Sequence, residues 1–427
     1  MWALRKPLIL ESNKDMSYDW IVIGGGISGI STAEILTREG HSVLLLEKND
    51  SLASETSKVF HEWLHTGSLF TLIPDNYLTT RYLLGAMDDL LMFYNQFDRM
   101  NLLPTELGLK VSGDGWFNND NIRYYYRNRR LNPIWTANVT RSINKVQSIK
   151  RHDWLRGRAG GDYTSVNAKS FFKEFYSLMI QNRKFVNVLS ADLTINSRIL
   201  ISDILNHAKT NGLEIRVNED VQRILKDGKK VKVQTSEEEY LCDNVVVCSP
   251  DLVSRLFNKK LKISYAPIAV VEGVPDEAEC FVELDYHSKN CINLLTKGGG
   301  YGQAGGISVS KKNLVDSYMQ FVIKEHKKRN PSIKLIDQYV GLKKEMVSEN
   351  QERNYLYHIN EHESNIWSLV LGKFTLAFSA APEFYRKVYK KNPSIYFDES
   401  LNLDQDFKIS ETSWKEIVNK GAINGND

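Results

Sequence analysis

The sequence predicts an α/β fold, α+β overall, and three observations lead to this prediction. Residues 19–47 follow the order strand, glycine turn, helix, strand, which is a βαβ unit. Short apolar strands separated by turns follow at 214–250, and a strand, a glycine and a helix recur over 364–391. The chain has 427 residues, more than one hydrophobic core usually serves, so we expect at least two structural units.

The βαβ unit begins with DWIVIGGG, an apolar strand that runs into three glycines. The following ISGISTAEILTREG has apolar residues at near-helical spacing, and Gly40 marks the expected end of this helix. HSVLLLEK then supplies a second apolar strand, Val43 to Leu46, which is closed by Glu47.

The glycine turn of this unit carries the pattern G-x-G-x-x-G at Gly24, Gly26 and Gly29. Gly24 permits a tight turn, Gly26 has no Cβ to block a pyrophosphate, and Gly29 lets helix and strand pack closely. A pyrophosphate would lie on the unpaired N–H groups of the helix start. Glu47 can accept hydrogen bonds from ribose hydroxyls. This context predicts a dinucleotide site, and the alternative is a purely structural glycine turn.

A second match, Gly300, Gly302 and Gly305 in GGGYGQAGG, is followed by the strand-like ISVS and by no helix. Without a helix N-terminus there is no cradle for an anion, so we interpret it as a flexible turn or a substrate-side loop. The remaining expected elements are a helix over 77–103, a mixed polar stretch over 104–190, an amphipathic helix over 192–212, strands in EIRVNEDVQRI, VKVQT and NVVVCSP, short strands with turns over 256–360, and no assigned structure from Asn392 onward.

The bulk properties exclude several classes of protein. Net charge is +3 from 55 basic and 52 acidic residues, which is too balanced to indicate a nucleic-acid partner. RYYYRNRR, residues 123–130, could stack on bases, but a strand and turn, or a basic patch that guides an anion, fits the overall charge better. No run approaches the roughly 18 apolar residues of a membrane span, and the short apolar stretch near the N-terminus is too short for a signal peptide.

The four cysteines, Cys242, Cys248, Cys280 and Cys291, form neither a disulfide framework nor a zinc knuckle. A reduced cytoplasmic setting is therefore expected. Peripheral contact with the inner face of the membrane is left open.

The stretch HEWLH, His61 to His65, fits the H-E-x-x-H zinc-protease signature. A zinc site of that type needs a third ligand, and Ser68 and Thr71 occupy the positions where an extended motif would supply it. Two other interpretations remain: a helical turn with two partly buried histidines, or a segment in which Trp63 lies near a cofactor and one histidine faces a substrate. No metal is expected.

Four segments resemble the FAD-dependent oxidoreductases of the D-amino-acid oxidase superfamily, and most closely its glycerol-3-phosphate dehydrogenase and 2-hydroxy-acid dehydrogenase branch. They are the glycine fingerprint with Glu47, SETSKVFH (similar to S-S-K-x-x-H), residues 192–250, and SLVLGKFTLAFSAAPE (similar to G-G-K-x-T-T). The resemblance implies a Rossmann-like FAD-binding domain, discontinuous in sequence, with a mixed-sheet substrate domain. The implied boundaries are 17–100, 190–255 and 361–391 for FAD binding, 101–189 and 256–360 for the substrate domain, and 392–427 for a C-terminal extension.

The resemblance also implies which residues contact FAD, including a backbone contact of Val221 with adenine. The implied set is Gly24, Gly26, Ile27, Ser28, Gly29, Glu47, Lys48, Thr56, Ser57, Lys58, His61, Val221, Ser249, Gly372, Lys373, Phe374 and Thr375.

The sequence departs from this branch where the substrate would bind. The branch's H-G-G-L-R-Y is H-E-W-L-H-T here, its G-G-K is Leu371-Gly372-Lys373, and its G-x-R-P ends in Lys343-Lys344. The flavin site is therefore expected to be kept and the substrate pocket to differ, which makes glycerol 3-phosphate itself a doubtful substrate.

The expected reaction is transfer of a hydride from a small polar, anionic alcohol (a hydroxy acid, sugar or sugar phosphate) to flavin N5. His61, His65 and His358 are candidate bases, because a neutral imidazole can take the hydroxyl proton. Lys343 and Arg353 resemble the cations that hold the substrate's anionic group, and Lys373 could assist them. An amine or amino-acid oxidase on the same scaffold and a non-catalytic flavin-binding protein are the alternatives. The electron acceptor is left open between oxygen, a quinone and a carrier.

Overall fold

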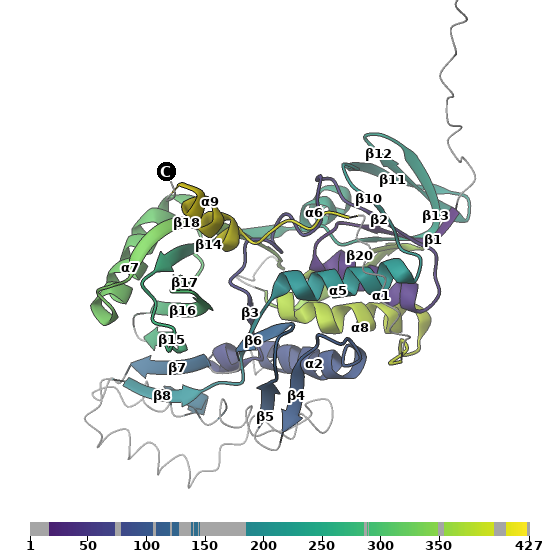
Figure 1. Ribbon diagram of the computed structural model, residues 1–427. Coiled ribbons are helices and arrows are strands. Elements are labelled where there is room, and N and C mark those ends of the chain that lie inside the picture. The colour runs from purple at the N-terminus through teal and green to yellow at the C-terminus, as the bar shows by residue number, and fades with distance from the viewer. Residues whose placement is uncertain are drawn as a thin grey trace, which may run out of the picture.

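The first sheet of the structure contains the βαβ unit and has eight strands (Figure 1). This computed structural model describes residues 17–72, 78–105, 108–119, 122–127, 138–139, 141–143, 145, 185–285, 288, 290–348, 354–396 and 407–424. Six strands follow the order β10 (Glu214–Arg216), β2 (Val43–Leu46), β1 (Ser17–Ile23), β13 (Glu239–Val247), β12 (Lys230–Thr235) and β11 (Val221–Asp227). β20 (Ile366–Leu371) pairs with β13, and β19 (Tyr357–Glu363) pairs with β20.

Strands β10, β2, β1, β13 and β20 are parallel to one another, as expected for a Rossmann-like unit, and the other pairings in this sheet are antiparallel. The central strands β1 and β2 are mostly apolar and buried, as expected for a sheet that helices cover. The predicted α/β fold is confirmed.

Three helices lie side by side on one face of this sheet: α1 (Ile27–Arg38), α5 (Ser197–Thr210) and α8 (Ala377–Tyr389) (Figure 1). The α1–α5 contact includes a buried polar group, in which Glu34 accepts hydrogen bonds from Arg38 and lies 2.8 Å from His207 Nδ1. Burial by itself raises the pKa of Glu34, but Arg38 and His207 outweigh it and hold that pKa below its ordinary value. The carboxylate thus stays charged between the two helices.

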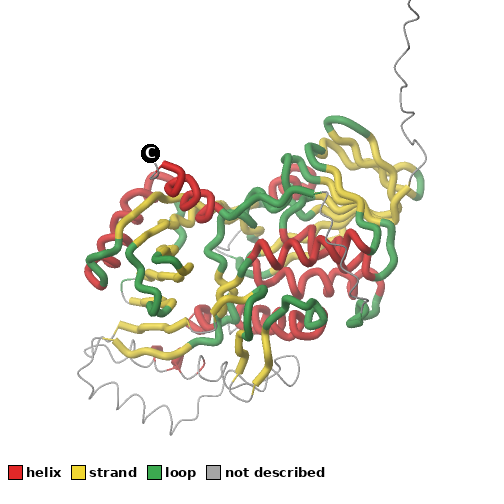
Figure 2. The backbone as a smooth tube through the Cα atoms, viewed as in Figure 1, coloured by secondary structure: helices red, strands yellow, loops and turns green. Residues whose placement is uncertain are grey.

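The second sheet is mixed and has seven strands (Figure 2). Their order is β18 (Lys334–Met346), β14 (Leu261–Glu272), β17 (Tyr301–Gly306), β16 (Asn290–Gly298), β15 (Cys280–Asp285), β7 (Ile122–Arg127) and β8 (Phe185–Leu189). Only β15 and β7 pair in parallel, and the other neighbours are antiparallel. Helix α7 (Val315–Arg329) packs against β14 and β17.

The remaining described elements lie outside these two sheets. They are β3 (Trp63–Leu64), η1 (Ser68–Leu72), α2 (Leu78–Phe93), β4 (Leu102–Thr105), β5 (Gly108–Val111), β6 (Phe117–Asn119), β9 (Leu193–Ile195), α6 (Pro250–Phe257), η3 (Lys312–Leu314), η4 (Phe374–Leu376) and α9 (Ser413–Asn424). β3, β9 and β6 form one short sheet, and β4 pairs with β5. No helix among the residues described above is both long and apolar enough to cross a bilayer.

Several predicted elements differ from the structure. The helix expected over 77–103 ends at Phe93, because turns follow and Leu102 starts a strand. The first residues of the helix expected over 192–212 form β9 instead, and Asn196 caps the helix that follows. α7 was missed within 256–360, and α9 was missed in the stretch left without structure.

The glycine-rich segment GGGYGQAGG with the ISVS that follows it, and the segment HEWLH, also differ from what the sequence predicted. GGGYGQAGG is the turn and second strand of the β16–β17 hairpin, and ISVS forms no strand, although Val309 makes an isolated bridge to Tyr265. HEWLH forms no helical turn: Glu62 has φ +58° and Trp63–Leu64 is strand. The helical geometry that a zinc-protease motif requires is therefore absent from this segment.

The described part of RYYYRNRR is a strand, β7, as expected. Tyr124 and Tyr126 point into the core, and Arg123 and Arg127 pair with Glu279 and with an aspartate of β15. These tyrosines provide no stacking surface for nucleic-acid bases. Residues 128–130 lie outside the described residues.

Candidate functional site

The glycine turn between β1 and α1 is built as its sequence predicts. Gly24 has φ +112°, a backbone conformation that side chains disfavour, and its N–H donates to Leu46 O at 2.8 Å. A Cβ on Gly29 would lie 1.9 Å from Gly24 O, so only glycine lets the helix approach the turn. Gly25 is less constrained, because a Cβ there would lie 2.6 Å from the end of the Leu52 side chain, which is easier to displace than backbone.

The start of α1 is open toward a cavity. Gly26 is the N-cap and offers no side chain to the first turn, and a Cβ on it would meet only Ser57 Oγ, at 3.4 Å. Ser57 Oγ accepts the N–H of Ile27 at 3.0 Å. A helix start with a glycine cap at the mouth of a cavity can receive a phosphate group.

Glu47 lies at the end of β2 beside this turn. One carboxylate oxygen accepts the N–H of Gly25 at 2.7 Å, and the other accepts the backbone and side-chain N–H groups of Asn49 at 2.9 and 2.7 Å. These bonds fix the carboxylate where it lines the cavity.

A cavity of about 470 Å³ runs from the glycine turn to the second sheet. This volume falls in the range of cofactor and substrate sites. The lining residues used below are Gly24, Gly26, Glu47, Ser57, Phe60, His61, Trp63, His65, Val221, Lys343, Glu345, Gly372 and Lys373.

Two lysines and two histidines that line this cavity lie near one another. Burial first, and then the charges of Lys343 and Lys297, lower the pKa of His61 to about 3. Burial also lowers the pKa of His65, to about 4, with a smaller contribution from Lys373. Both rings are therefore neutral at physiological pH and can accept a proton.

Asp192 supports this part of the site from behind. Its fully buried carboxylate accepts hydrogen bonds from Trp63 Nε1 (3.0 Å), Thr66 N (2.8 Å), Thr66 Oγ1 (2.7 Å) and Tyr124 OH (2.5 Å). His65 Nδ1 is 3.7 Å from Asp192 Oδ2, too long for a hydrogen bond but close enough for the charge to act on the ring. Burial alone raises the pKa of Asp192, and its partners outweigh it so that the pKa is lowered.

Most residues expected from the sequence meet at this cavity. Those that line it are Gly24, Gly26, Ile27, Ser28, Glu47, Lys48, Thr56, Ser57, His61, His65, Val221, Ser249, Lys343, Gly372, Lys373 and Phe374. Gly29 and Thr375 lie behind the wall, where Gly29 packs on Gly24 and Thr375 Oγ1 accepts the N–H of His65 at 3.1 Å.

Two expected residues lie elsewhere, and a third is not described. Lys58 pairs with Glu416 at 2.7 Å and does not line the cavity. His358 lies on β19, outside the lining, with its Nε2 2.7 Å from Asn354 Nδ2. Arg353 lies outside the described residues. The candidate base is therefore His61 or His65.

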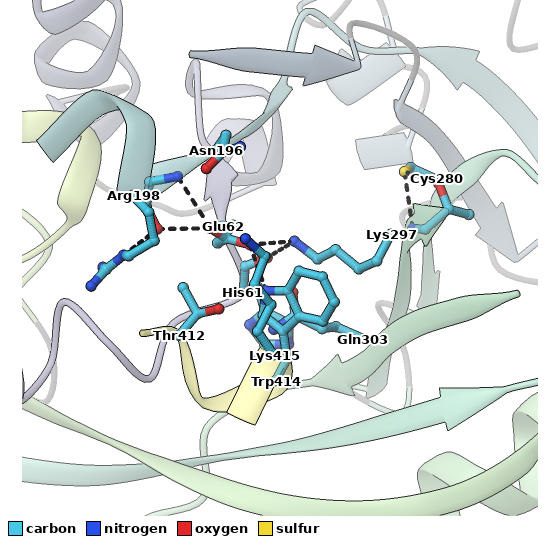
Figure 3. Close-up of polar contacts among 12 residues, drawn as sticks. His61, Glu62, Asn196, Arg198, Cys280, Lys297, Gln303, Thr412, Trp414 and Lys415 are labelled. Atoms are coloured by element: carbon cyan, nitrogen blue, oxygen red, sulfur yellow. Dashed lines mark hydrogen bonds and ion pairs between the residues drawn. The ribbon is translucent and has the colours of Figure 1, made fainter. Parts of the chain in front are cut away.

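Sequence reasoning missed the polar residues behind the cavity wall. Glu62, Lys297 and Trp414 form a cluster (Figure 3), and Asp192 anchors Trp63. The one signal in the sequence was Glu62, a charged residue where the motif H-G-G-L-R-Y has glycine. It did not reveal that Lys297 and Trp414 are the partners of Glu62.

The model of the family described as FAD dependent oxidoreductase (DAO) matches residues 19–274, more than half of the chain. The chain belongs to this family, and the protein is an FAD-dependent oxidoreductase.

Similar solved structures agree in fold. L-α-glycerophosphate oxidase from Mycoplasma pneumoniae has 17% identity and a TM-score of 0.63, with 91% of this chain and 98% of that chain covered. Glycine oxidase from Geobacillus kaustophilus has 14% identity and a TM-score of 0.59, covering 92% and 99%. L-amino acid deaminase from Proteus vulgaris has 16% identity and a TM-score of 0.59, covering 90% and 92%.

The residues present fit FAD as the cofactor. Gly24 and Gly26 line the cavity at the start of α1, where a diphosphate would lie. Glu47 is held by its own hydrogen bonds at the edge of the same cavity, within the region where a ribose would follow the diphosphate.

Proposed function

We propose that the protein oxidises a small polar, anionic alcohol of the hydroxy-acid, sugar or sugar-phosphate class. The observation that carries this proposal is that Lys343 and Lys373 line the same cavity as two neutral histidines, His61 and His65. When bound, FAD accepts the substrate's hydrogen and two electrons as a hydride.

The two lysines would bind the anionic group of the substrate. Lys343 comes from β18 of the second sheet and Lys373 from the turn after β20 of the first, so the anion would bridge the two sheets. Lys373 Nζ lies 4.7 Å from the ring centroid of Tyr355 and 5.0 Å from that of Phe70, and these aromatic faces restrict where it can point. Charge-assisted hydrogen bonds from both ammonium groups favour a carboxylate or phosphate.

A neutral histidine would take the hydroxyl proton as the hydride leaves. His61 Nε2 is buried and has no hydrogen-bond partner among the described residues. The pKa values near 3 and 4 are low for a base at neutral pH, but the negative charge of a bound substrate would raise them toward the working range. For His65, the nearby Asp192 carboxylate would stabilise the imidazolium that forms.

An amine or amino-acid oxidase is the second candidate. Glu345 lies two residues from Lys343 on β18, hence on the same face of the strand, and it also lines the cavity. A carboxylate beside a lysine could bind the ammonium and carboxylate of an amino acid. The similar structures include both an amino-acid deaminase and a glycine oxidase, which supports keeping this candidate.

Anaerobic mixing of the FAD-loaded protein with a substrate panel tests the proposal. The panel contains sugar phosphates, 2-hydroxy acids and amino acids, each beside its analogue without the hydroxyl or amino group. Bleaching of the flavin's visible absorption by hydroxy compounds supports the first candidate, and bleaching by amino acids alone supports the second. Reoxidation by oxygen or by a quinone then identifies the acceptor.

Lys343→Gln tests the anion site, and Lys334→Gln is the matched control. Lys334 lies on the same strand but is 75% exposed and distant from the cavity lining. Loss of one charge-assisted hydrogen bond, about 1.5–3 kcal/mol, should raise KM for an anionic substrate by about tenfold or more. An unchanged KM in Lys343→Gln would remove this lysine from the site.

We also propose the domain division given by the sequence, with the FAD-binding part at 17–100, 190–255 and 361–391 and the substrate part at 101–189 and 256–360. The two sheets support it in outline. A cytoplasmic location with peripheral membrane contact remains a prediction, which cell fractionation would test.

A further inference from the structure

Glu62 occupies an unusual position in the cavity wall. It lies between His61 and Trp63, which line the cavity, but it is not itself among the lining residues. Figure 3 shows its carboxylate joined to Lys297. Its φ of +58° is a conformation that residues other than glycine rarely adopt.

The carboxylate of Glu62 is held by three separate parts of the chain. Ser197, the first residue of α5, donates its N–H (3.1 Å) and its hydroxyl (2.7 Å) to Oε1. Lys297 of β16 donates to Oε2 at 2.8 Å, and Trp414 Nε1 of α9 donates to the same oxygen at 2.7 Å. The four donors come from the first sheet's helix layer, the second sheet and the C-terminal helix.

The cluster is closed to solvent and balanced in charge. The side chains of Glu62 and Lys297 are each 5% exposed. Burial by itself raises the pKa of Glu62, but Lys297 and the hydrogen bonds from Ser197 and Trp414 outweigh it and keep the pKa below its ordinary value. Lys297 Nζ also lies 5.2 Å from the Trp414 ring centroid and donates to His61 O at 3.3 Å. Glu62 and Lys297 therefore both restrain the backbone of the residue that carries a candidate base.

Other contacts bring the C-terminal segment 407–424 to the same place. Lys58 pairs with Glu416 of α9 at 2.7 Å. Arg198 donates to Ser57 O at 2.7 Å and also to Ser410 O. The segment thus reaches both ends of the loop 57–62 that lines the cavity.

We propose that Glu62 is a positioning residue. Its contacts with α5, β16 and α9 fix the backbone that presents His61 and Trp63 to the bound flavin. FAD binding therefore depends on the docked C-terminal helix. The backbone of a residue other than glycine at φ near +60° relaxes to other conformations unless its surroundings hold it. The four hydrogen bonds supply that restraint, and a glycine without them would leave the loop free to adopt other conformations. The inference relies on FAD occupying the cavity and is independent of the substrate proposed above.

Four full-length variants test the proposal, and FAD is the only ligand used. Glu62→Gly permits the same φ but removes the anchor. Glu62→Gln keeps the shape and removes the charge, and Trp414→Phe removes one donor from α9. Asn365→Gly is the control, because Asn365 also has a positive φ (+68°) but lies in the β19–β20 turn, outside the cavity lining. The dissociation constant of FAD and the fluorescence of bound FAD are measured for each, since a nearby indole such as Trp63 quenches flavin emission.

Glu62→Gly should weaken FAD binding on the order of tenfold, because the released loop must be ordered again when FAD binds. Its bound FAD should fluoresce more strongly than in the wild type. Glu62→Gln and Trp414→Phe should change both quantities in the same direction, Trp414→Phe least, and Asn365→Gly should change neither.

The proposal is overturned if the soluble Glu62 and Trp414 variants bind FAD with wild-type affinity and emission, or if they lose only thermal stability. If Glu62→Gly does not fold, Glu62→Gln and Trp414→Phe decide by the same two readouts. Because no substrate is involved, these outcomes are separate from success or failure of the substrate panel.

Discussion

Replacing Lys297 by methionine should destabilise the protein in a pH-dependent way. Lys297 Nζ lies 2.8 Å from Glu62 Oε2, and both side chains are 5% exposed. Methionine fills nearly the same volume but leaves Glu62 as a buried carboxylate with only Ser197 and Trp414 as donors. Removal of one partner from a buried ion pair costs about 3–5 kcal/mol, so we expect a loss of that size at pH 7.

The direction of the pH dependence follows from the pKa of Glu62. In the wild type this pKa is held below its ordinary value of 4.5, because Lys297 and the other donors outweigh burial. The stability that Glu62 contributes is therefore present above pH 4.5 and is lost as the pH falls through the folded-state pKa. Without Lys297, burial dominates and the folded-state pKa rises above 4.5. The variant then recovers as Glu62 takes up a proton on acidification.

Urea unfolding of the FAD-loaded wild type and Lys297→Met, from about pH 8 down to about pH 5, measures this difference in free energy. The difference should be largest at neutral pH and should shrink toward the acid end. Lys334→Met is the control, since its pair with Glu272 is exposed and should be worth less than about 1 kcal/mol. A loss below about 1 kcal/mol in Lys297→Met, or a loss independent of pH, would contradict the reasoning.

Three further substitutions test the cavity wall. Gly29→Ala places a Cβ 1.9 Å from Gly24 O, so the turn must shift; thermal unfolding should show a loss of about 1–3 kcal/mol, and FAD titration should show weaker binding. Gly305→Ala places a Cβ 2.3 Å from His61 Nε2, so the imidazole must move. Steady-state kinetics should then show a lower kcat with FAD affinity unchanged. An unaltered kcat would argue against His61 as the base. Ser57→Ala removes the acceptor of the first N–H of α1. Chemical unfolding should show a loss of about 1 kcal/mol in the free energy of unfolding. Ser54→Ala, next to the same loop, is the comparison.

The FAD-binding part was predictable because its determinants lie close together in sequence. Gly24 needs its positive φ, and Gly29 is fixed by contact with Gly24 five residues earlier. The close contact at Gly25 was not predictable, since it involves Leu52, which the following loop brings against the turn. Helix α9 was missed because its segment is polar and its role depends on the surface it covers.

The candidate site was predicted only in part. His61, His65, Lys343 and Lys373 do line one cavity, as their motifs indicated. His358 does not, because β19 pairs with β20 at the edge of the first sheet and carries it away from the lining.

The sequence by itself determined the family, the cofactor and the turn that receives it, since these depend on hydrogen bonds and close contacts within one βαβ unit. Only the tertiary structure decided what Glu62 does. Its partners Ser197, Lys297 and Trp414 are 135, 235 and 352 residues away along the chain. The letters HEWLH fit both a zinc-protease motif and a segment whose glutamate is a buried structural anchor. Folding distinguishes them, because it excludes water from the carboxylate and brings an ammonium group and three other donors to it instead.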